Sequence, residues 1–256
     1  MYLAADIEAA IVEMADEDKR VQLMRFFKTG LGQYGFGDRF LGVTAPQVRM
    51  VVKEAKRHVD LDQIHLLVTS PYHEVRLCGF LLLVELMLAA RPKRRGDNAE
   101  LARRRRELAQ FYLNHTRQAN NWDLVDMSCP KILGTYLAYP DENGKLPSTA
   151  VLYGLAESGD LWDQRIAMVT NWMLIRFDRF DTTIDIALKL LNHPHDLIHK
   201  AVGWMLREMG KRRPELLHQF LHDFLPQMHR TTLRYAIELL PEHERQSYLR
   251  MPISRL

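Results

Sequence analysis

The sequence predicts an all-α protein, and three observations carry this prediction. Apolar residues recur at the helical period in most long segments, as in residues 181–193 and 215–228. No segment alternates apolar and polar residues around the Asn-Gly or Asp-Gly turns that mark strands in a hairpin. Glycine and proline fall between the periodic segments. The chain should therefore consist of helices joined by loops.

Helix starts and loops can be placed from the same residues. Pro71, Pro194 and Pro214 lie where periodic segments begin, and proline is favoured in the first turn of a helix. Residues 29–46 form a Gly-rich stretch, and residues 139–148 form a second stretch of turn formers. We expect both stretches to be loops.

Four of the predicted helices resemble one another. Each carries a basic residue just ahead of an apolar stretch that contains small residues, at Arg76, Arg165, Lys200 and Arg234. The last three are 35 and 34 residues apart, close to the spacing of about 40 residues in HEAT-type helix-pair repeats. We therefore predict a single HEAT-like repeat domain over residues 1–256, built as a solenoid of antiparallel helix pairs with a concave basic face. The alternative is a compact bundle of amphipathic helices.

Composition limits the class of protein. The chain has 256 residues, of which 47% are hydrophobic, enough for a substantial core. Its two cysteines, Cys78 and Cys129, are far apart, which is typical of a reducing compartment. The first twenty residues carry acids where a secretory signal needs bases, and no apolar run could span a membrane. We expect a cytoplasmic monomer without a membrane segment.

Charge is unevenly distributed along the chain. The formal net charge is only +3, but residues 91–106 contain eight Lys or Arg against two acids. Further bases gather at 210–215 and 229–234. Such local patches suit phosphate groups, although a charge run can also be a solvated helix face.

Residues 119–128, ANNWDLVDMS, pair an indole with a carboxylate. In a helix capped by Asn120 or Asn121, Trp122 and Asp126 would be i, i+4 neighbours on one face. The apolar side of that helix would be formed by Leu124, Val125, Ser128 and Cys129, with the pair at its margin. A lone Trp is most often a core residue and a lone Asp a surface charge, so the local pattern leaves both structural and functional interpretations open.

The same stretch resembles the signature of the AlkD family of DNA alkylation-repair glycosylases. In that family a Trp-Asp-x-x-Asp turn carries the catalytic carboxylate. Three further segments are similar to family motifs and follow in the same order: YGFGDRFLGVTAPQVR at 34–49, LWDQRIAMVT at 161–170 and KAVGWMLREMGK at 200–211. The four motifs span residues 34–211, most of the chain.

The resemblance implies roles for five residues. Asp126 would be the catalytic carboxylate, and Trp122 and Trp204 would be the two indoles that flank the sugar of the damaged nucleotide. Arg165 would bind the DNA backbone near the lesion, and Arg207, three residues after Trp204, would be a further phosphate ligand. The partner would be double-stranded DNA with alkylated bases, and the nucleotide would not be drawn into a deep pocket.

The chemistry agrees with these residue types. A purine alkylated at N3 or N7 is cationic and leaves readily, so one carboxylate beside two indoles can stabilise the oxocarbenium-like sugar without an acid catalyst. His195 and His199 are spaced to share a zinc ion, but no third ligand accompanies them, and we expect neither a metal nor a cofactor. The alternative from another class is a non-catalytic HEAT-like scaffold that binds DNA structures or a protein partner.

Overall fold

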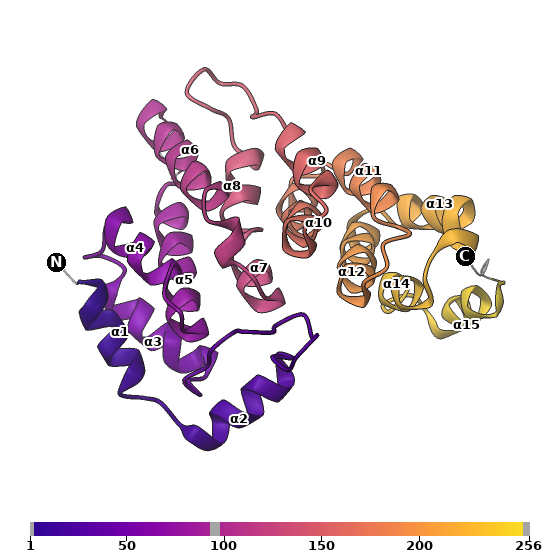
Figure 1. Cartoon of the computed structure of the whole chain (residues 1–256). Helices are drawn as coiled ribbons and strands as arrows, with labels where there is room; N and C mark the ends of the chain where they lie inside the picture. The colour runs from indigo at the N-terminus through magenta and orange to yellow at the C-terminus, as the bar shows by residue number, and fades with distance from the viewer. Residues whose placement is uncertain (1–2, 93–97, 253–256) are drawn as a thin grey trace. The chain divides into compact units, whose positions relative to one another are not determined.

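The computed structural model describes residues 3–92 and 98–252, and these residues form an all-helical structure (Figure 1). Within the described residues the one β-type pairing is an isolated bridge between Arg39 and Tyr72. The predicted all-α class is therefore confirmed. No helix in the described part of the chain is long and apolar enough to cross a membrane.

The chain divides into two compact units. The first comprises Met1–Ile132 with Asp141–Asn143, and the second comprises Leu133–Pro140 with Gly144–Leu256. The single domain over residues 1–256 that the sequence suggests remains a prediction.

The first unit is organised around a buried helix, α5 (His73–Ala89). Its neighbours, in chain order, are α1 (Ala4–Val12), α3 (Ala45–Ala55), α4 (Leu61–Val68), α6 (Ala99–Leu113) and α7 (Trp122–Ser128). Gly79 lets α4 approach α5 closely, because a Cβ atom at this position would lie 2.7 Å from a methyl group of Val68. The remaining helix, α2 (Glu17–Phe26), buries none of its residues and leads into the Gly-rich loop before α3. Thr116–Gln118 form a short 3₁₀ helix, η1, ahead of α7.

The second unit stacks helices in the repeated manner that the sequence predicts. Its elements are α8 (Leu133–Ala138), α9 (Ala150–Glu157), α10 (Leu161–Arg176), α11 (Asp181–Lys189), α12 (Asp196–Arg212), α13 (Pro214–Phe224), η2 (Leu225–Gln227), α14 (Arg230–Ala236) and α15 (Glu242–Arg250). Helices α10, α12 and α14 pack successively in one row, with α9 and α11 beside it (Figure 1). Gly203 allows the close contact of α12 with α14, since a Cβ atom there would lie 2.5 Å from the carbonyl oxygen of Thr232. This row confirms a helical repeat.

The four bases of the repeated helices differ in how exposed they are. Arg76 is only 6% exposed and Arg165 only 5% exposed. Lys200 is half-buried and its ammonium lies 2.8 Å from a carboxylate oxygen of Asp196, whereas Arg234 is exposed. Both guanidinium groups have backbone partners in the interior: Arg76 donates to the carbonyl oxygen of Ser70, between α4 and α5, and Arg165 donates to that of Leu197, in the first turn of α12. A concave basic face remains a prediction that these two side chains do not support.

The predicted basic segment 91–106 is described only in part, since residues 93–97 lie outside the described residues. Four arginines of this segment occupy α6. Arg103 is exposed, whereas Arg105 is 1% exposed and donates to the carbonyl oxygen of Ala90 at 2.9 Å. Arg104 forms an ion pair with Glu107 at 2.6 Å, and Arg106 pairs with Glu142. Arg104 and Arg106 therefore each have a carboxylate partner within the protein.

Candidate active site

Helix α7 carries the predicted indole and carboxylate on one short segment. The side chain of Asn121 caps it by accepting the Trp122 N–H at 2.9 Å, as expected of one of the two candidate caps. Trp122 and Asp126 are both partly exposed. The predicted apolar side is confirmed, since the side chains on it are fully buried: Leu124, Val125, Ser128 and Cys129. The i, i+4 pair therefore lies at the margin of the core.

Aromatic rings support Trp122 from the N-terminal part of the chain. The Phe27 ring stacks on Trp122 with centroids 5.3 Å apart, and Phe26 meets the indole edge-on at 5.8 Å. Phe27 in turn stacks on Phe40 at 5.1 Å, and Phe40 stacks on the imidazole of His73 at 4.3 Å. Phe26 itself is 60% exposed. The indole therefore ends a stack of rings that leads into the core.

A buried ion network lies at the inner end of this stack. The His73 ring, 1% exposed, has Nδ1 2.8 Å from Oδ2 of Asp38 and Nε2 2.9 Å from Oδ2 of Asp123. Arg76 donates to the other oxygen of Asp38 at 2.6 Å. Burial alone would lower the pKa of His73, but the charge and hydrogen bond of Asp123, and then those of Asp38, raise it to about 9. His73 is therefore an imidazolium at neutral pH.

The same network controls the pKa of Asp38. Burial alone would raise it, but the hydrogen bond and charge of His73, followed by those of Arg76, hold the pKa of this carboxyl below its usual range. The two carboxylates, Asp38 and Asp123, are thus balanced by two cations. Sequence reasoning did not single out His73, Asp38 or Asp123 as site residues. The only local signal was the position of Asp123 inside the Trp-Asp-x-x-Asp turn.

The Gly-rich loop is attached to α5 by a third buried carboxylate. Glu74, 1% exposed, accepts the backbone N–H groups of Leu41, Gly42 and Val43 at distances between 2.9 and 3.2 Å. Gly42 has φ +86°, and a Cβ atom there would lie 2.0 Å from the carbonyl oxygen of Asp16. The hydrogen bonds to Glu74 therefore fix the backbone of the segment that follows Asp38.

Basic side chains gather near the C-terminal end of α7. The Nη2 atom of Arg49, an exposed residue of α3, lies 3.6 Å from the sulfur of Met127, the residue after Asp126. Burial and the charges of Arg49 and Arg91 lower the pKa of Lys131, although Glu85 opposes this effect. This concentration of positive charge was not predicted, because its members come from three separate segments.

The other predicted site residues lie in the second unit. Trp204 and Arg207 are both partly exposed on α12, three residues apart. Arg207 pairs with Glu238 and lies 3.5 Å from a carboxylate oxygen of Glu208. Arg165 lies on α10, which packs against α12, and its Nη1 atom donates to the carbonyl oxygen of Leu197. Trp122 and Asp126 belong to the first unit, and these three belong to the second.

The histidines that the sequence raised as metal ligands have other contacts. His195 accepts the Leu197 N–H at 3.1 Å as the cap of α12, and the His199 ring stacks on His229 with centroids 4.0 Å apart. Residues 3–92 and 98–252 contain no group of three or more His, Cys, Asp or Glu side chains arranged to hold a metal ion.

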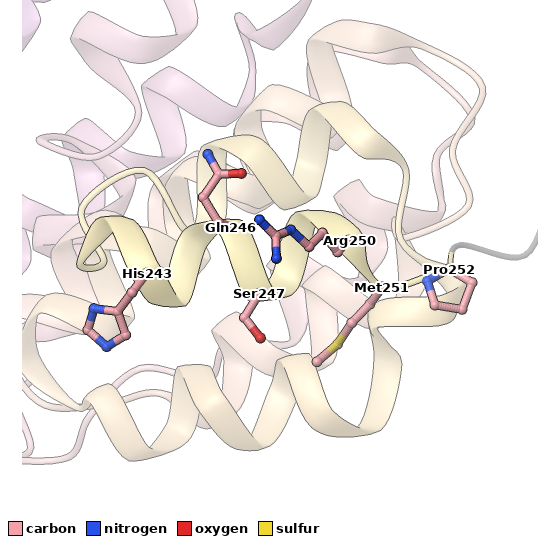
Figure 2. Close-up of a pocket in the computed structure, with 6 residues that line it drawn as sticks. All are labelled: His243, Gln246, Ser247, Arg250, Met251 and Pro252. Atoms are coloured by element: carbon pink, nitrogen blue, oxygen red, sulfur yellow. The ribbon is translucent and has the colours of Figure 1, made fainter.

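A surface pocket of the second unit lies away from the predicted site residues of that unit. It is formed along α15 and the residues that follow it, and Figure 2 shows its lining: His243, Gln246, Ser247, Arg250, Met251 and Pro252. None of Trp204, Arg165 and Arg207 lines this pocket.

Comparisons with known proteins support the family resemblance. A family model described as DNA alkylation repair enzyme matches residues 7–240. Among solved structures, the chain is similar to one described as "Predicted DNA alkylation repair enzyme from Enterococcus faecalis", with a TM-score of 0.61 and 17% sequence identity over 90% of this chain and 98% of that chain. That likeness shows a shared fold. Among curated proteins, no sequence matches this chain significantly.

Proposed function

Because the chain belongs to the DNA alkylation repair enzyme family, we propose that it is a DNA glycosylase of base excision repair. Its substrates are cationic purines alkylated at N3 or N7 in duplex DNA, and its reaction is hydrolysis of the N-glycosidic bond. Asp126 is the catalytic carboxylate, and Trp122 and Trp204 are the indoles that contact the sugar of the damaged nucleotide.

One observation carries this proposal: the capped helix α7 presents a partly exposed indole and a partly exposed carboxylate one turn apart. Packing against Phe27 explains the position of the indole but not the choice of a carboxylate one turn after it. Reaction at a sugar that becomes cationic uses both groups. The carboxylate supplies negative potential and orients water, and the indole face attracts positive charge.

The leaving group explains why a single carboxylate is enough. Enzymes that cleave ordinary glycosidic bonds generally use two carboxyl groups, one of which protonates the leaving oxygen. An N3- or N7-alkylated purine already carries a positive charge, so it leaves without protonation. The proposed site needs stabilisation of the sugar and a positioned water.

Binding to the phosphate backbone is assigned to bases around these side chains. In the second unit, Arg165 of α10 and Arg207 of α12 are the residues that we propose contact DNA phosphates. The exposed guanidinium of Arg49, beside the residue that follows Asp126, adds a phosphate contact in the first unit. The DNA partner is a duplex. The protein binds its phosphate backbone and does not draw the damaged nucleotide into a deep pocket.

The decisive experiment measures release of free base from methylated duplex DNA by the purified full-length chain. We expect N3-methyladenine or N7-methylguanine to appear in the soluble fraction with wild-type protein and not with Asp126→Asn. Untreated duplex is the matched substrate control. Binding to the methylated duplex without base release would favour the non-catalytic scaffold instead.

A further inference from the structure

His73 connects three segments that are far apart in the sequence. It is the first residue of α5, and both of its ring nitrogens face carboxylate oxygens. Each nitrogen must carry a proton to donate to its carboxylate, so the ring is a charged bridge between them. Asp38 lies within the Gly-rich loop, and Asp123 lies in the first turn of α7.

The charged groups that face this bridge are balanced. Asp38 also accepts a hydrogen bond from Arg76. The Arg76 guanidinium donates further to the carbonyl oxygens of Ser70 and Gln118, at 3.1 and 3.3 Å, and to Oδ1 of Asn120 at 3.0 Å. On α7, the other carboxylate oxygen of Asp123 accepts the Leu124 N–H at 2.8 Å. Glu74, the next residue on α5, is directed at the loop backbone instead.

Asp123 is adjacent to Trp122, so the bridge acts at the start of the proposed catalytic helix. The helix comprises only Trp122–Ser128, and a helix this short takes its direction from the groups that hold its ends. The ring stack makes a second connection, because Phe40 lies on His73 and Phe27 lies between Phe40 and Trp122. The His73 imidazolium thus contacts Asp123, the residue next to Trp122, and also Phe40, which belongs to the ring stack that ends at Trp122.

A buried quartet of charges is a costly way to fill a core. Apolar side chains of similar volume often give equal or greater stability, whereas ionic contacts define one geometry. The network joins the Gly-rich loop to the helix that carries Trp122 and Asp126, and geometry at that helix decides the proposed reaction.

We infer that His73 is a positioning residue, which orients Trp122 and Asp126 by bridging Asp38 of the Gly-rich loop and Asp123 of α7. This inference rests on the proposed glycosylase function for its rate measurements. Its spectroscopic measurement does not depend on that function.

The test compares His73→Gln with Glu74→Gln in the full-length chain. Glu74 is the matched control, because it is an equally buried residue of the same helix that holds the same loop but makes no hydrogen bond to α7. At a temperature where both variants are folded, we expect His73→Gln to lower the single-turnover excision rate by about tenfold or more, with DNA affinity within about twofold of wild type. Glu74→Gln should keep its rate within about threefold.

Rescue separates orientation from simple loss of charge. His73→Gln leaves Asp123 without a cation, and adding Asp123→Asn replaces the ion pair with a neutral amide pair. We expect the double variant to recover part of the rate lost by His73→Gln. The inference would be overturned if the double variant lost as much rate as His73→Gln. It would also be overturned if the rate losses of His73→Gln and Glu74→Gln simply followed their losses of thermal stability.

A fluorescence measurement covers the case in which the wild-type protein releases no base. In a chain whose other tryptophans, Trp162, Trp172 and Trp204, are replaced by Phe, emission reports on Trp122 alone. We expect His73→Gln to shift this emission and Glu74→Gln to leave it unchanged. Absence of base release with this shift present would reject the glycosylase proposal and retain the positioning role, and absence of the shift would reject the positioning role.

Discussion

The Nε2 atom of His73 lies 2.9 Å from Oδ2 of Asp123, the residue that follows Trp122. The two aspartates of the Trp-Asp-x-x-Asp turn therefore have different environments. Asp123 is 3% exposed and bound to an imidazolium, whereas Asp126 is partly exposed on the same helix. A buried, paired carboxylate is suited to holding structure, and the more exposed Asp126 is the one that we propose acts on substrate.

Stability should depend on the protonation of His73. Its folded pKa of about 9 is above the ordinary value of 6.5, so the stabilisation is complete below pH 6.5 and is lost as pH rises through 9. The difference between the folded and the ordinary pKa of His73 corresponds to roughly 3 kcal/mol of unfolding free energy. Denaturant unfolding of wild type and His73→Gln at several pH values between 6 and 10 measures it.

The difference in unfolding free energy between wild type and His73→Gln separates the titration of His73 from that of other groups. Three other histidines, His193, His195 and His199, have lowered pKa values, chiefly because of burial, so they titrate on the acid side of this range. We expect the stability gap between wild type and variant to narrow steadily from pH 6.5 to 9. A constant gap would show that His73 does not titrate in this window.

Asp126→Asn should remove chemistry and spare binding. Loss of the carboxylate removes negative potential at the sugar, and we expect single-turnover excision to fall by roughly a hundredfold or more. Affinity for DNA should stay equal or improve, because an anion facing a polyanion is lost. Rapid-quench excision together with fluorescence anisotropy measures both quantities, and an unchanged excision rate would contradict the assignment.

Arg165→Ala tests the proposed backbone contact. We expect affinity for damaged and undamaged duplex to fall equally, with the slope of log affinity against log salt reduced by about one ion contact. Because Arg165 is interior, the variant should also lose thermal stability, and binding must be measured well below its unfolding temperature.

Arg234→Ala is the comparison for Arg165→Ala, since this base occupies the corresponding repeat position but is exposed and belongs to the basic patch at 229–234. A loss of stability in Arg165→Ala with unchanged DNA affinity would assign Arg165 to the core alone. A loss of affinity restricted to damaged DNA would mean that it recognises the lesion.

Lesion charge should decide which bases are released. The recognised motifs place no second acid to protonate a leaving base, so N3- and N7-alkylpurines should react while ethenoadenine, hypoxanthine and uracil are nearly inert. Activity should persist in a chelator, because no metal-bound water is required. Single-turnover rates on duplexes with one defined lesion measure this. Similar rates on neutral lesions would reveal an acid catalyst, and loss of activity in chelator would revive the histidine-metal alternative.

The helices could be predicted from the sequence because their signals are local. Helical period and proline placement predicted the all-α class, and the spacing of Arg165, Lys200 and Arg234 matched the row of α10, α12 and α14. The Trp122 and Asp126 pair was predictable for the same reason, since i, i+4 neighbours meet within one turn whatever surrounds them.

Only the tertiary structure decided which charges are buried and what they bind. His73 meets Asp38 across 35 residues of chain and Asp123 across 50, and no local pattern encodes those contacts. Arg76 and Arg165 precede apolar helices of similar sequence, as expected of a basic surface, yet both guanidinium groups lie in the interior. Periodicity shows which face of a helix is apolar, but the partner of a charge at its margin depends on segments that folding brings together.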